Sequence, residues 1–202
     1  MKKSIIAGAG AAAFGLAVIP FAGVSASTQT ITITDTIQPT VSTACEFTRT
    51  GEAYSTAQTG VSNVAWSDAT GTNTGTYSAT ITPGSLAILG TSEFTGYCNA
   101  TNGFSVTVAA PNLTKGEDTI QLSTAQLSAG DEGYTVYRTT GTAAYLANGG
   151  TLMSANAATT STSAVTASVQ YTVGTATTTE AGTYSGNVVY TFSYDDPNVS
   201  GS

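Results

Sequence analysis

The two cysteines are the side chains whose number and spacing carry the clearest chemistry in this chain. They are Cys45 and Cys98, and the chain holds no other cysteine. Two cysteines in an exported protein usually form one disulfide, so we predict a Cys45–Cys98 bond. A reactive thiol or a thiolate metal site is the alternative, but neither cysteine stands in a C-x-x-C pair or beside a basic residue.

Histidine is absent from the sequence, and this narrows the catalytic chemistry that remains. Ser-His-Asp and Cys-His catalysis are removed, together with the commonest transition-metal ligand. The acidic pairs Glu117-Asp118, Asp131-Glu132 and Asp195-Asp196 each stand beside glycine or proline. Paired carboxylates can hydrolyse glycosides, and clustered ones can bind calcium. Expected turn positions favour solvated side chains instead, so we predict no enzyme activity, no metal and no cofactor.

One lysine and the aromatic side chains are the remaining candidates for a chemical or binding role. Lys115 is the only lysine after Lys3, and it could serve a Ser-Lys dyad or a Lys–Asn cross-link, although its surroundings indicate a turn. Trp66 and the 10 tyrosines could stack on sugar rings, as in carbohydrate-binding modules. Their places on apolar strand faces favour core packing. A glycan therefore remains an alternative partner.

The charge balance is acidic and the charge density is low. The chain has 5 Lys and Arg against 12 Asp and Glu, a formal net charge of −7, and only 8% charged residues. A typical soluble domain has about 25%. Nucleic-acid binding draws most of its affinity from Lys and Arg at phosphates, so we expect no nucleic-acid partner.

The first 26 residues have the three-part pattern of a secretory signal peptide. Met1-Lys2-Lys3 is positively charged, Ile5 to Val24 carries no charge, and Val24-Ser25-Ala26 has small residues where cleavage occurs. An uncleaved membrane anchor is the alternative, because the apolar run is long enough to span a bilayer. We predict a secreted or cell-surface protein with a signal peptide at 1–26 and no membrane span after cleavage.

Alternation with a period of two runs through the rest of the chain and predicts strands. It is clearest over 104–108, 165–173 and 184–194, and shorter strands are expected at 61–66, 75–82, 92–98, 118–122 and 133–139. Only Ala143 to Met153 suggests a short helical turn. We predict one all-β domain at 27–194, an antiparallel β-sandwich, followed by a flexible acidic tail at 195–202.

Two segments resemble spore-coat-U-like and pilin-like secreted bacterial surface proteins. One is the run from Gly96 to Val108, where Cys98 precedes a polar turn and an alternating strand, and the other is Ala181 to Phe192. The resemblance implies an immunoglobulin-like sandwich that assembles into surface fibres or coats, often by donating a strand to a neighbouring subunit. Such families usually end at the last strand, whereas this sequence continues with Asp195 to Ser202.

The segment Ser27 to Gln38 offers a physical route to such assembly. Ile31, Ile33 and Ile37 lie on one face of an extended, nearly uncharged stretch. A strand of this kind can complete the edge of another subunit through backbone hydrogen bonds. Asp35 interrupts the apolar face between Ile33 and Ile37, and it favours the alternative, in which this segment is the first strand of its own sandwich. We therefore predict a non-catalytic structural subunit that associates with itself or with other surface proteins, with a secreted adhesin or carbohydrate-binding module as the alternative.

Overall fold

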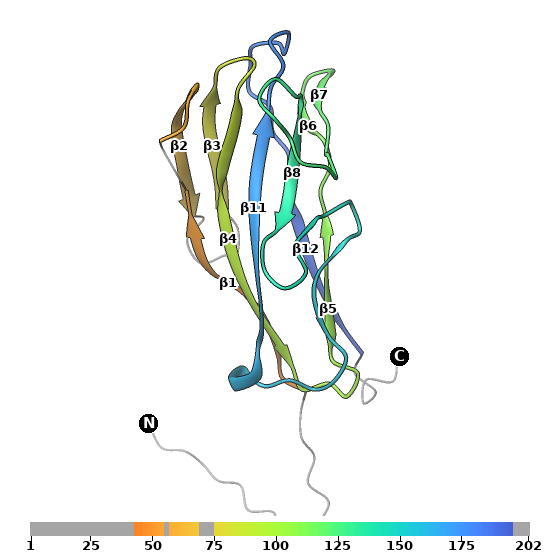
Figure 1. Cartoon of the computed structure of the whole chain (residues 1–202). Helices are drawn as coiled ribbons and strands as arrows, with labels where there is room; N and C mark the ends of the chain where they lie inside the picture. Colours follow the sequence, from red (N-terminus) through yellow and green to blue (C-terminus); the bar gives the residue numbers. More distant parts are fainter. Residues whose placement is uncertain (1–42, 55–56, 69–74, 196–202) are drawn as a thin grey trace, which may run out of the picture. The chain divides into compact units, whose positions relative to one another are not determined.

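The computed structural model describes residues 43–54, 57–68 and 75–195 (Figure 1). These residues belong to one unit of the chain, which begins at Val41. The predicted signal peptide, the strand carrying Ile31, Ile33 and Ile37, and the tail beyond Asp195 lie outside the described residues. Within the described ranges, no helix is long and apolar enough to cross a membrane.

Five strands form the larger sheet, in the order β1-β4-β11-β8-β9 and with every neighbouring pair antiparallel. Val, Thr and Tyr make up six of the ten residues of its central strand, β11, and these residue types suit a pleated, half-buried surface. The strands are β1 (Cys45–Ala53), β4 (Leu86–Cys98), β11 (Val165–Gly174), β8 (Gly133–Arg138) and β9 (Ala144–Tyr145).

A three-stranded antiparallel sheet and two hairpins accompany the larger sheet. The three-stranded sheet has the order β10 (Thr151–Ala155), β5 (Phe104–Ala109) and β12 (Val189–Tyr194). The hairpins are β2 (Val61–Asp68) with β3 (Gly75–Ile81), and β6 (Leu113–Lys115) with β7 (Asp118–Ile120). The β2–β3 hairpin contacts β4 (Figure 1). One short 3-10 turn, η1 (Ser161–Ser163), precedes β11.

Alternation within the strands places the core between the two sheets. In β5, Phe104, Val106 and Val108 are buried, and the residues between them are partly exposed. They share one apolar cluster with residues of the larger sheet such as Phe94 and Val169. Two antiparallel sheets that cover each other's apolar faces in this way form a β-sandwich. The predicted all-β, antiparallel class is confirmed.

Three local predictions are corrected by the structure. The helical turn expected from Ala143 to Met153 is wrong, because this stretch forms β9 and β10 around a turn at Gly149, whose φ is +82°. Pairing with β5 and burial of Leu152 override the weak helical pattern. The last strand begins at Val189 rather than at residue 184, and β4 begins at Leu86 rather than at residue 92.

Candidate functional site

The predicted disulfide joins the first residue of β1 to the last residue of β4. Cys45 and Cys98 are direct partners in the strand register, and their Cα atoms lie 4.0 Å apart. Cys98 is fully buried. Just beyond the bond, Asn99 N donates to the carbonyl oxygen of Ala44 at 3.1 Å, and Ala44 N donates to Asn99 Oδ1 at 2.6 Å. The start of β1 is therefore fixed by one covalent bond and two hydrogen bonds.

Trp66 packs against its neighbours in β1 and β3. The guanidinium carbon of Arg49 lies 4.3 Å from the centre of an indole ring, and the Tyr77 ring lies 4.4 Å away. A side chain added at Gly75 would collide with the indole. Trp66 is half-buried, and its Nε1 is buried without a hydrogen-bond partner among the described residues. Its position agrees better with packing than with a freely presented sugar platform.

Three tyrosine hydroxyls meet between the sheets beside Ser92. The hydroxyl of Tyr77 donates to the carbonyl oxygen of Thr91 at 2.8 Å and lies 2.9 Å from Ser92 Oγ. The hydroxyls of Tyr171 and Tyr190 are 2.8 Å apart. Burial raises the pKa of Tyr171 to about 12 and raises the pKa of Tyr190 well above its usual range. These phenols remain neutral at physiological pH and act as structural hydrogen-bonding groups.

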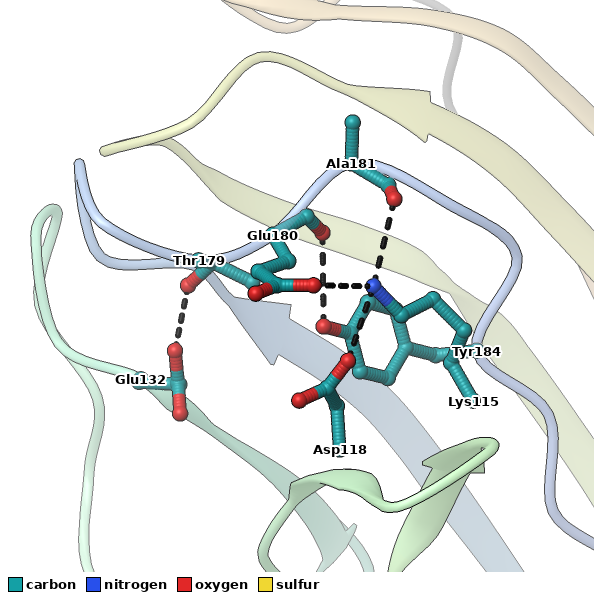
Figure 2. Close-up of polar contacts among 7 residues, drawn as sticks. All are labelled: Lys115, Asp118, Glu132, Thr179, Glu180, Ala181 and Tyr184. Carbon is teal, nitrogen blue, oxygen red and sulfur yellow. Dashed lines mark hydrogen bonds and ion pairs between the residues drawn. The ribbon is translucent and has the colours of Figure 1, made fainter.

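Lys115 lies at the centre of a surface network that we call the lysine clasp, formed with Asp118, Glu180 and Tyr184 (Figure 2). Its Nζ atom lies 2.9 Å from Asp118 Oδ2 and 3.0 Å from Glu180 Oε2. It also donates to the carbonyl oxygen of Ala181 at 3.2 Å. The Tyr184 ring lies 5.4 Å from Nζ, and its hydroxyl donates to the Glu180 carbonyl. The clasp ties the β6–β7 hairpin to a segment about 65 residues away.

The clasp holds its lysine in the charged form. Hydrogen bonding to Asp118 and Glu180 raises the pKa of the Lys115 ammonium, and the same contact lowers the pKa of the Asp118 carboxyl. A protonated lysine has no lone pair for nucleophilic attack or for proton abstraction. The Ser-Lys dyad and the Lys–Asn cross-link considered from the sequence both require a neutral amine. The ion pairs with Asp118 and Glu180 instead favour a structural role for Lys115.

Replacing Lys115 with methionine is expected to lower the melting temperature slightly near neutral pH, because both carboxylates lose their partner. Asp118 has a lowered pKa in the folded state, so its contribution is full above its ordinary pKa of 3.8 and disappears as the pH falls through the lowered value. Melting curves of wild type and Lys115→Met should therefore converge near pH 2. Lys115→Arg is the matched control and should retain most of the effect. An equal difference at both pH values would contradict this account.

The remaining acidic pairs serve turns and loops. Asp131 Oδ2 accepts a hydrogen bond from Ser128 N at 2.8 Å, and the Thr179 hydroxyl donates to Glu132 Oε2. Asp195 is exposed at the end of β12. Within the described residues, no group of three or more Cys, Asp or Glu side chains is placed to hold a metal ion. The solvated-turn interpretation of Asp131 and Glu132 agrees with these contacts.

One surface hollow lies where β1 meets β4. It has a volume of about 130 Å³ and is lined by Gly51, Glu52, Ala53, Thr91 and Glu93. Ligand pockets typically have volumes of about 300–1,000 Å³ and mostly apolar walls. Two carboxylates and a small volume make this hollow a poor site for an organic ligand.

Most outer strands carry features that oppose pairing with another chain. Charges, bulges and short lengths all serve this purpose. β1 carries Glu46, Arg49 and Glu52, and its register shifts between Arg49 and Gly51. β2 has a register shift between Ser62 and Ala65 and a residue of positive φ, Asn63. β9 has only two residues.

Arg138 protects another edge, a role that the sequence did not indicate. Its Nη1 atom donates to the carbonyl oxygens of Thr151 and Leu152 in β10, each at 3.0 Å. Its Nε and Nη2 atoms donate to the Thr142 carbonyl at 2.9 and 2.6 Å. One guanidinium thereby occupies backbone acceptors of β10 and joins this strand to β8. β12 forms the other edge of the three-stranded sheet that contains β10, and it carries no charged residue.

The candidate functional surface is therefore the edge of β12. This strand pairs with β5 in six consecutive residue pairs without a register shift. Val189 is 51% exposed and Tyr194 is 46% exposed. The signal for this edge was visible in the sequence as an uncharged alternating run, but its position at a sheet edge was not. Comparisons of the chain with protein-family profiles, with curated proteins and with solved structures returned no match.

Proposed function

We propose that this protein is an exported, non-catalytic structural subunit of a bacterial cell-surface fibre or coat, built on an immunoglobulin-like sandwich. The observation that carries the proposal is the edge of β12, which is uncharged and regular, on an all-β fold closed by a disulfide. Proteins normally protect such edges because exposed strands pair with other chains. An edge that none of the described strands covers suits a protein whose role is assembly.

Strand donation by residues 27–38 is the route that we propose for fibre growth. Ile31, Ile33 and Ile37 would face the core of the neighbouring subunit, with Asp35 on the same face, and Thr32, Thr34 and Thr36 would face solvent. The segment ends seven residues before Cys45, where the disulfide fixes β1. A rigid attachment point close to the donated strand transmits tension directly into the fold of the donating subunit.

The test compares two double variants of the full chain after export into an oxidising compartment. Ile31→Lys/Ile33→Lys places charges on the apolar face, whereas the matched control Thr30→Lys/Thr32→Lys places them on the polar face. Light scattering after size separation and negative-stain microscopy should show assemblies for wild type and control, and their loss in the isoleucine variant. Wild-type protein that stays monomeric at high concentration would overturn the structural proposal, and assembly of the isoleucine variant would overturn strand donation.

An adhesin or carbohydrate-binding module is the second candidate. It is favoured by Trp66, whose half-buried indole ring lies beside the guanidinium group of Arg49. The Nε1 atom of Trp66 has no hydrogen-bond partner among the described residues. Monomeric protein with glycan binding that weakens in Trp66→Ala would favour this function over the structural one.

A further inference from the structure

We propose that the β12 strands of two copies pair antiparallel about a two-fold axis at Phe192, so that their three-stranded sheets become one continuous sheet. The inference rests on the proposed structural function and deepens it by naming one contact between subunits. It is a contact between identical surfaces, and at any one β12 edge it competes with the donation of residues 27–38.

The chemistry of β12 permits such pairing. Its six residues, Val-Tyr-Thr-Phe-Ser-Tyr, contain no charge and no proline. Within the described part of the chain, β5 is its only strand partner. The backbone groups along its other side are those that a further strand would use. Among the strands that the structure describes, no other outer strand combines this length, regularity and lack of charge without a covering contact, because β3, which is also uncharged, lies against β4 through Tyr77.

The sequence of β12 is complementary to itself in this register. Opposite residues of an antiparallel pair share a face of the sheet. An axis at Phe192 places Phe192 opposite its own copy and Tyr190 opposite Tyr194 of the second copy, all on the core-facing side. On the exposed side, Thr191 comes opposite Ser193 of the second copy. Aromatic residues therefore meet aromatic residues, and hydroxyl residues meet hydroxyl residues.

Charge selects the antiparallel direction. Asp195 follows β12 directly, and the chain has a net charge of −7. A parallel pairing would bring the two Asp195 carboxylates side by side, and like charges directly opposite each other destabilise a strand pair. Antiparallel pairing places them at opposite ends of the joined strands. The partner that this edge fits best is consequently a second copy of the same strand.

The aromatic side chains at this edge are already ordered before association. The Phe192 ring stacks on Phe104 at 5.0 Å and on Phe47 at 6.0 Å, and the Tyr194 ring lies 5.8 Å from it. Ordered side chains lose less conformational entropy on binding. In this register β12 forms five residue pairs with its copy, and Val189 lies opposite Asp195 of the second copy, so the interface is smaller than that of a standard stable complex. The dimer should therefore depend on protein concentration.

The experiment measures dimerisation of the full exported chain by sedimentation equilibrium. Thr191→Lys/Ser193→Lys places lysines opposite lysines at two symmetric positions and should weaken the dimer about tenfold or more. Thr191→Lys/Ser193→Glu is the matched variant, since each lysine then faces a glutamate of the second copy, and it should restore the dimer. Both side chains are exposed in the described structure, so circular dichroism should report an unchanged fold.

Three results would overturn the proposal: a wild-type monomer at all concentrations, no weakening in the lysine pair, or no recovery in the lysine–glutamate pair. The last would mean that another register or another partner, such as residues 27–38, occupies the edge. The wild type and both variants are also made with Ile31→Lys/Ile33→Lys, a change that should leave the dimerisation of each unaltered. A dimer without larger assemblies would support this contact and contradict the fibre function, so the two failures are distinguishable.

Discussion

Removing the disulfide with Cys45→Ala/Cys98→Ala is expected to lower the free energy of unfolding by about 4 kcal/mol. The bond closes a loop of 53 residues, and in the chain-entropy model this closure lowers the conformational entropy of the unfolded chain. Typical domains are stable by only about 5–15 kcal/mol in total, so the loss is a large share of the stability. Alanine is chosen because Cys98 is fully buried and serine would leave a hydroxyl there.

Urea denaturation followed by tyrosine and tryptophan fluorescence measures this loss. Wild-type protein treated with a thiol reductant is the control, because it loses the bond without losing the side chains, and it should show a similar decrease. Amide exchange should also become faster in β1, which depends on the bond for its position beside β4. A decrease below about 1 kcal/mol in both samples would show that backbone pairing alone holds β1.

The second large effect is expected at alkaline pH, where the protein should lose stability steeply between about pH 10 and pH 12. Burial raises the pKa of both Tyr134 and Tyr171 to about 12. In the unfolded chain these phenols lose their protons near pH 10, while in the folded protein they keep them. Stability from these groups is therefore full below pH 10 and falls as the pH rises. Between about pH 10 and pH 12, each such tyrosine lowers the free energy of unfolding by about 1.4 kcal/mol per pH unit.

Urea midpoints measured at several pH values from about 8 to 12 test this slope, with tyrosinate absorbance recorded on the same samples. Tyr171→Phe/Tyr190→Phe is the matched variant, because it keeps both rings and removes the pair of hydroxyls that lie 2.8 Å apart. Its stability should depend less steeply on pH. If wild type and variant lose stability in parallel, Tyr171 and Tyr190 do not cause the alkaline transition.

Local sequence patterns predicted the elements whose two faces differ clearly. Val106 and Val108 alternate with Thr107, and Val169 alternates with Ser168 and Gln170, and each apolar residue is buried as expected. A strand exposes successive side chains on opposite faces, so this information is local. The Cys45–Cys98 bond could also be predicted, because a pair of cysteines allows a single intramolecular disulfide. The signal peptide and the donor strand with Ile31, Ile33 and Ile37 remain predictions.

Strand boundaries and short strands were less predictable. Ala143 to Met153 resembles a short helical turn in its own sequence, but hydrogen bonding to β5 makes its second half a strand. The energy of that pairing comes from residues more than 40 positions away. A reading of neighbouring residues cannot include it.

By itself, then, the sequence determined the all-β class, the disulfide and the lack of histidine chemistry, because composition and period-two alternation are properties of the chain alone. Only the tertiary structure decided which strands lie at sheet edges, that Arg138 covers β10, that Lys115 is held by Asp118 and Glu180, and that β12 is uncovered on its outer side within the described residues. The physical reason is that an edge is defined by the absence of a neighbour in space. That absence depends on how all the strands pair, and no segment of sequence contains it.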